Sequence, residues 1–117
     1  LGTVFELMHT AVKPYPSCRY GHAGIDAALM LRAANDIQAK DITAIRLGLP
    51  KSGMLLIGAP ADKKANPQNV VDGQFSGPFV ISSALATGTT RCPSSPNAVN
   101  SFRREASSGS ISSTIKC

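Results

Sequence analysis

At residues 13–22 the chain runs Lys13-Pro14-Tyr15-Pro16-Ser17-Cys18-Arg19-Tyr20-Gly21-His22, and a helical pattern begins at the end of this stretch. The stretch holds a lysine, a thiol, an arginine, two phenols and an imidazole. Each of its prolines fixes its own φ angle and favours an extended backbone in the residue before it. The sequence therefore predicts a rigid, extended segment that presents polar side chains at the start of a helix.

The helical pattern continues from about Gly21 to Asn35 and is rich in alanine, which favours a helix. Its apolar residues Ile25, Ala28 and Leu29 form one stripe. The first N–H groups of a helix have no partner within it and attract anions, as does the positive end of the helix dipole. We therefore expect the side chains near residue 21 to take part in an anion site.

Three segments have the features of strands. Residues 4–12 are rich in strand formers, residues 42–49 alternate apolar and polar side chains, and residues 54–57 are a short apolar run. The predicted fold class is α+β, with two helices packed on a small, incomplete antiparallel sheet and an irregular tail.

A second helical region is predicted over residues 70–87, interrupted near Pro78. Its first part is a short helix that ends near Phe75. Ser76 can cap the following helix, because a proline is tolerated in a first turn and serine is a favoured N-cap. Gly88 is then expected to end that helix. Residues 58–69 have the composition of a loop.

The composition changes after Gly88. Residues 89–117 hold eight serines and four Lys or Arg, with no helical or strand period. We interpret residues 1–88 as a partial domain, and residues 89–117 as a serine-rich basic tail that is either disordered or not the natural continuation of the domain. The chain starts at Leu1 rather than Met, directly before a predicted strand, which indicates a fragment.

The charge and the cysteines narrow the class of protein. The net charge is +5, and residues 91–117 alone carry four basic groups against one acidic group. Three widely spaced cysteines without a CxxC pair argue against a disulfide framework or a structural zinc site, and indicate a reducing compartment. With no signal peptide and no membrane-length apolar run, we expect a cytoplasmic protein, or a mitochondrial one in a eukaryote, with neither membrane nor nucleic acid as a partner.

The polar residues of the opening stretch suit carboxylate chemistry. Lys13 and Arg19 can each hold a carboxylate, the arginine through two parallel hydrogen bonds. His22 can act as an acid or a base near neutral pH. Cys18 is a candidate nucleophile without a specified partner set. The chain has no phosphate-binding loop, GxGxxG, HExxH or EF-hand pattern.

Residues 13–28 resemble the KPYPSCRYTHAAIDAA signature of the MmgE/PrpD family, which includes 2-methylcitrate dehydratase and cis-aconitate decarboxylase. Residues 41–47 resemble the strand that follows in the family, and residues 72–80 its DAQFSLPYV segment. The resemblance covers residues 5–88 and does not extend into the tail. The chain departs from the pattern with Gly21 for Thr, Gly73 for Ala and Phe79 for the frequent Tyr.

The resemblance implies the start of an α+β lid domain that closes on a large helical domain, with the active site between them. It implies a lyase that dehydrates, decarboxylates or epimerises small di- or tricarboxylates, as in propionate metabolism, without a metal or organic cofactor. The full-length form is expected to be a homodimer, and the isolated chain to be inactive. The implied catalytic residues are Lys13, His22 and Cys18, and the implied substrate-binding residues are Lys13, Arg19 and Gln74.

Two other functions stay open at the level of sequence. The basic charge allows a small module that binds nucleic acid or another anion, although the excess charge lies mainly in the tail. The chain could also be a non-functional truncated product that exposes apolar surface. The sequence does not separate a dehydratase from a decarboxylase or an epimerase.

Overall fold

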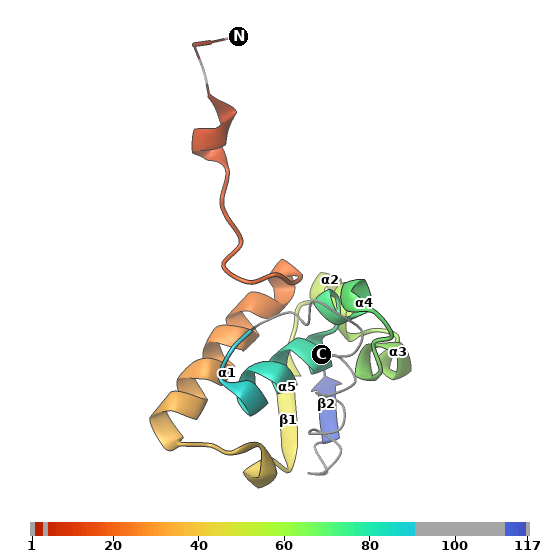
Figure 1. Ribbon diagram of the computed structural model, residues 1–117. Helices are drawn as coiled ribbons and strands as arrows, with labels where there is room; N and C mark the ends of the chain where they lie inside the picture. Colours follow the sequence, from red (N-terminus) through yellow and green to blue (C-terminus); the bar gives the residue numbers. More distant parts are fainter. Residues whose placement is uncertain (1, 4, 91–111, 117) are drawn as a thin grey trace.

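The computed structural model describes residues 2–3 and 5–90 and the backbone of residues 112–116. Two long helices, α1 (His22–Asn35) and α5 (Gly77–Thr87), pack against each other beside the strand β1 (Ala44–Gly48), as Figure 1 shows. The shorter helical segments are η1 (Glu6–His9), η2 (Arg19–Gly21), η3 (Ala39–Asp41), α2 (Lys51–Gly53), η4 (Met54–Gly58), α3 (Ala61–Ala65) and α4 (Val70–Gln74).

Helix α1 has nearly the predicted bounds. It ends at Asn35 because Asp36 adopts a left-handed conformation with a φ angle of 47°, which aspartate tolerates better than most residues. Ile25 and Ala28 lie one turn apart and are almost completely buried. The predicted apolar stripe is therefore the face that α1 turns toward the core.

The core lies where α1, α5 and β1 meet. Its buried members are Ile25, Ala28, Ile81, Ala84 and Leu85, and Ile45 and Leu47 of β1 pack against them. Arg32 joins the two helices at one end, because its guanidinium donates to the carbonyl oxygens of Leu85 and Ala86 near the C-terminus of α5. A cation is favoured there by the helix dipole. None of the described helices has the length and apolarity to cross a membrane.

Strand β1 confirms the strand predicted over residues 42–49, but the predicted antiparallel sheet is not found. β1 pairs in parallel with β2 (Ser112–Lys116), from Ala44 beside Ser112 to Gly48 beside Lys116. A parallel pair requires a long crossover, and here the chain passes through α2 to α5 between the two strands. The fold is therefore mixed and mostly helical. The prediction of an irregular tail is wrong for residues 112–116; residues 91–111 and 117 lie outside the described residues.

The strand predicted over residues 4–12 is wrong in its described part. Residues 6–9 form the short 3-10 helix η1, in which Met8 N–H donates to the Phe5 carbonyl oxygen at 3.1 Å. The described strands pair with each other, and the segment that carries η1 extends away from the helices (Figure 1). Without a neighbouring strand, local hydrogen bonds satisfy the backbone better than an extended conformation does.

The strand predicted over residues 54–57 is also wrong, because α2 runs directly into the π-helical segment η4. Gly53 and Ile57 are buried while Leu55 and Leu56 are exposed, which is a helical spacing and not an alternation. In a sequence, a short apolar run is compatible with both a helix and a buried strand. The loop predicted over residues 58–69 contains the short helix α3.

The two-part helix over residues 70–87 is confirmed. The Ser76 hydroxyl caps α5 by accepting a hydrogen bond from the Phe79 N–H at 3.1 Å, and Pro78 lies in the first turn. Gly88 ends the helix with a φ angle of 68°. The same hydroxyl donates to the Lys64 carbonyl oxygen, so Ser76 also attaches α3 to the junction of α4 and α5.

Candidate functional site

The lysine segment (Lys13–Ser17) is held against the rest of the fold by backbone hydrogen bonds. The Ser17 N–H donates to the Tyr15 carbonyl oxygen at 2.8 Å, which closes a tight turn. The next N–H, that of Cys18, donates to the Gln74 carbonyl oxygen at 2.9 Å. These bonds place the lysine segment beside the C-terminus of α4. Lys13 therefore lies near Gln74 and Phe75.

The carbonyl oxygen of Ser17 is a meeting point for two of the predicted site residues. Lys13 Nζ donates to it at 3.4 Å, and His22 Nε2 lies 3.3 Å from it. A carbonyl oxygen can only accept, so this contact requires the proton on Nε2. In the neutral imidazole, Nδ1 is then the nitrogen with a free lone pair, and it is the atom that can take up a proton.

An open hollow of about 430 Å³ lies along the lysine segment, with residues from the end of α4 as its other wall. This volume is in the range of pockets that hold small molecules. The lining is made of Lys13, Pro14, Tyr15, Pro16, Ser17, Gln74 and Phe75. Lys13 and Gln74, both predicted to bind substrate, therefore share one hollow. An ammonium group and a side-chain amide are suitable hydrogen-bond donors to a carboxylate.

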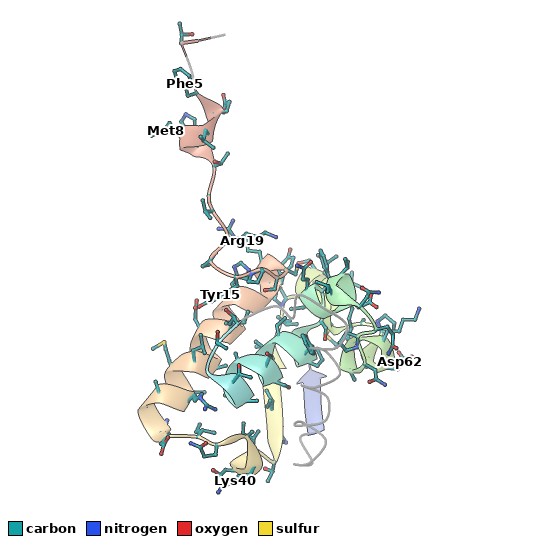
Figure 2. All side chains as sticks on the ribbon, in the orientation of Figure 1. Phe5, Met8, Tyr15, Arg19, Lys40 and Asp62 are labelled. Carbon is teal, nitrogen blue, oxygen red and sulfur yellow. The ribbon has the colours of Figure 1, made fainter. Side chains whose placement is uncertain are left out.

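The other three predicted site residues do not line this hollow. Arg19 is exposed and lies where the extended segment joins the helices (Figure 2). Cys18 is buried, with 8% of its surface exposed, and has a free thiol. His22 is buried behind the lysine segment, one carbonyl group away from Lys13. The structure thus brings His22 close to Lys13 and leaves Arg19 exposed, outside the lining of the hollow.

Tyr15 is held by contacts on two sides. Its hydroxyl donates to a carboxylate oxygen of Asp26 on α1, and its ring meets the His22 ring edge-on, with centroids 5.3 Å apart and planes at 87°. The hydrogen bond to Asp26, followed by desolvation and by the negative charge of Asp26, raises the pKa of Tyr15. Tyr15 also packs against the core cluster.

The sequence prediction missed three residues of this region. Phe75 forms part of the hollow, Ser17 supplies the shared carbonyl oxygen, and Asp26 binds Tyr15. Asp26 had a signal in the sequence, because residues i and i+4 of a helix lie on the same face and Asp26 follows His22 at that spacing. Phe75 and Ser17 had none beyond their neighbours, since their positions depend on tertiary contacts.

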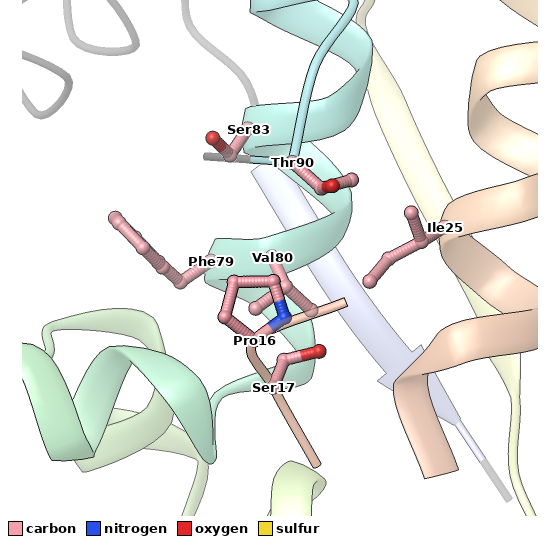
Figure 3. Close-up of a pocket in the computed structure, with 7 residues that line it drawn as sticks. All are labelled: Pro16, Ser17, Ile25, Phe79, Val80, Ser83 and Thr90. Atoms are coloured by element: carbon pink, nitrogen blue, oxygen red, sulfur yellow. The ribbon is translucent and has the colours of Figure 1, made fainter. Parts of the chain in front are cut away.

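Ser17 also faces the interior of the fold. Its hydroxyl oxygen is buried and has no hydrogen-bond partner within the described part of the chain. It lines a cavity of about 20 Å³ between the lysine segment, α1 and α5, shown in Figure 3 with Ile25, Phe79 and Val80. That volume is close to the space that one water molecule needs, and far below that of a carboxylate substrate. The small cavity is therefore not a substrate site.

Within the described residues, no three His, Cys, Asp or Glu side chains gather as the ligands of a metal ion. A scan against protein families matches residues 15–103 to the MmgE/PrpD C-terminal domain. The match begins within the lysine segment and continues past Gly88 to Arg103, so it extends beyond the boundary that composition suggests. Searches of curated proteins and of solved structures give no match.

Proposed function

The chain belongs to the MmgE/PrpD family, whose C-terminal domain its residues match, and from this premise we propose that it is the lid part of a lyase for small di- or tricarboxylates. The hollow is the lid's side of the site, and a helical domain of the same protein closes it. The observation that carries the proposal is that Lys13 and Gln74 line one open hollow of about 430 Å³.

Lys13 and Gln74 have the simplest role, which is to hold a substrate carboxylate. The ammonium group supplies charge and up to three N–H donors, and the amide supplies two more. Arg19 is exposed and does not line the hollow, and it binds a second carboxylate of a larger substrate when the helical domain closes over it. A lysine that is desolvated by this closure can also donate a proton.

His22 is the acid–base group of the proposed site. Its Nε2 proton is directed to the Ser17 carbonyl oxygen, which leaves Nδ1 as the nitrogen that exchanges a proton with substrate. Because the side chain is buried and does not line the hollow, it reaches substrate only if the lysine segment moves during closure. Cys18 is the third proposed catalytic residue. Because its thiol is buried, it reaches substrate only if the lysine segment moves during closure.

We assign dehydration of a 2-methylcitrate-like substrate as the reaction. The base removes a proton from the carbon next to a carboxylate, and the electron pair of that C–H bond forms a C=C bond. The hydroxyl on the adjacent carbon leaves as water after it receives a proton from the acid. Cations that hold the carboxylates stabilise the negative charge that develops on them. Decarboxylation and epimerisation begin with the same clamp on the carboxylates.

Turnover tests this proposal. The chain alone is expected to leave 2-methylcitrate unchanged, while the chain joined to a helical MmgE/PrpD domain forms the unsaturated tricarboxylate, followed by its ultraviolet absorbance. Lys13→Met should lower kcat/KM by roughly 10²–10⁴-fold, the usual contribution of one acid–base or charge-stabilising group. Lys63→Met, on the exposed surface of α3, is the matched control. Equal activity in the two variants would contradict the assignment.

A further inference from the structure

We propose that Asp26 is a positioning residue that acts through Tyr15 on both the lysine segment and His22. Only the effect of Asp26 on substrate binding rests on the proposed function. The observation is a chain of contacts: the Tyr15 hydroxyl donates to the Asp26 carboxylate, and the Tyr15 ring lies edge-on to the His22 ring at 5.3 Å.

The backbone around Tyr15 is restricted, so the position of Tyr15 affects the position of its neighbours in the lysine segment. The residue lies between Pro14 and Pro16, whose φ angles are fixed, and its carbonyl oxygen accepts the Ser17 N–H. Few backbone torsions are therefore free between Tyr15 and its neighbours. When Asp26 holds the phenol beside α1, it also sets where the Ser17 carbonyl oxygen lies. That oxygen is the one on which Lys13 and His22 converge.

A charged acceptor is well suited to this task. A hydrogen bond to a carboxylate is stronger than one between neutral groups, and Asp26 lies in the interior of α1, with backbone fixed by the helix. The edge-on ring contact then restricts the rotation of His22, whose Nε2 is already directed to Ser17. The Asp26 carboxylate thus selects one orientation of the imidazole without touching it.

A direct effect of Asp26 on His22 is the competing explanation. The two residues are four apart on α1, a spacing at which a carboxylate and an imidazolium can interact. In the structure, the carboxylate accepts from Tyr15, and His22 Nε2 lies at the Ser17 oxygen. Among the described residues, the contact from Asp26 to His22 therefore passes through the phenol ring. A double-mutant cycle separates the two routes.

The experiment records the ring resonances of the two histidines of the chain, His9 and His22, by proton–carbon NMR. The variants are Asp26→Asn, Tyr15→Phe and the double variant, with Asp36→Asn and Tyr20→Phe as matched controls. Far-UV circular dichroism confirms that each variant is folded. Because Asp26 is exposed and Tyr15→Phe keeps the ring, two independent variants probe the same hydrogen bond.

Asp26→Asn and Tyr15→Phe should each shift the His22 resonances and the amide resonances of the lysine segment, and leave the His9 resonances unchanged. The control variants Asp36→Asn and Tyr20→Phe should not shift the His22 resonances. The double variant should move His22 no further than either single variant. Two results would overturn the proposal. One is a His22 resonance that does not move in Tyr15→Phe. The other is an Asp26→Asn effect that persists at full size when Tyr15 is already Phe, since Asp26 would then act directly.

The same variants connect this role to the proposed function. Asp26→Asn and Tyr15→Phe should each weaken the binding of tricarballylate roughly threefold to tenfold, as expected for one lost hydrogen bond. If no variant and not even the natural chain binds a tricarboxylate, the proposed function fails. The NMR cycle still decides whether Asp26 positions His22 through Tyr15.

Discussion

Ser76→Ala, at the N-cap of α5, should destabilise the fold more than the substitution of a serine within α5. The hydroxyl caps the helix through the Phe79 N–H, and the loss of such a cap costs about 1 kcal/mol, with a range of about 0.5–2. The hydroxyl also donates to the Lys64 carbonyl oxygen, and the side chain has 0% of its surface exposed. Leaving that oxygen without its donor costs about 1–3 kcal/mol. Together the two losses predict a decrease of about 2–4 kcal/mol in the free energy of unfolding.

Urea unfolding, followed by circular dichroism at the helical band, measures this decrease as a lower midpoint with an unchanged slope. The melting temperature should fall by roughly 8–32 °C, given about 4–8 °C per kcal/mol in a small domain. Ser82→Ala is the matched control, because Ser82 is also buried in α5 but lies away from its N-terminus. A loss below about 1 kcal/mol for Ser76→Ala, or an equal loss for Ser82→Ala, would refute the assignment of Ser76 as the cap of α5.

Three further predictions concern the contacts of α1 and the lysine segment. Gly24→Ala should destabilise the chain by about 1–3 kcal/mol, because the new Cβ would lie 2.8 Å from a methyl group of Ile81 in α5. In the control Gly21→Ala the nearest neighbour of the new Cβ is at 3.4 Å, and this variant should not be destabilised. Equal decreases in the melting temperature of the two variants would contradict this prediction. Ser17→Ala should leave the urea midpoint unchanged or raised, because the hydroxyl it removes is buried without a partner among the described residues; a lower midpoint would mean that it has one. In Tyr20→Phe, which leaves Tyr15 as the chain's only tyrosine, the phenol pKa read by ultraviolet titration should lie above 10.0 because of the hydrogen bond to Asp26 and burial. The stability from this raised pKa is present below the unfolded value and is lost as the pH rises through the folded value, and Asp26→Asn should lower the pKa toward 10.0.

The sequence predicted those elements whose bounds are set by local chemistry. Ser76, Pro78 and Gly88 determine where α5 begins and ends, and each acts through its own backbone or the next turn. The helical period of the apolar residues in α1 also predicts which face of the helix is buried. By contrast, residues 4–12 are rich in strand formers and residues 54–57 are a short apolar run, yet residues 6–9 and 54–57 are helical. A strand depends on a partner elsewhere in the chain, which a local pattern does not reveal.

The candidate site divides in the same way. Lys13 and His22 could be chosen from the motif. The extended conformation predicted from the prolines is not found over residues 14–17, where the chain bends and the Ser17 N–H donates to the Tyr15 carbonyl oxygen. The shared Ser17 oxygen, the burial of Cys18 and the bond from Tyr15 to Asp26 could not be predicted from the motif, because each depends on how the segment folds back onto α1 and α4. Motif spacing identifies candidate groups, while their accessibility follows from packing.

Carboxylate binding at the hollow tests the central claim most directly. Tricarballylate is titrated into the chain while the amide resonances of the lysine segment and the side-chain amide of Gln74 are followed by NMR. We expect saturable shifts at these positions, and an affinity that Lys13→Met lowers by roughly tenfold or more, the value of one charge-assisted hydrogen bond. Lys63→Met should bind as the natural chain does. Shifts that appear elsewhere, or equal affinities for the natural chain and Lys13→Met, would contradict the claim that this hollow binds carboxylates.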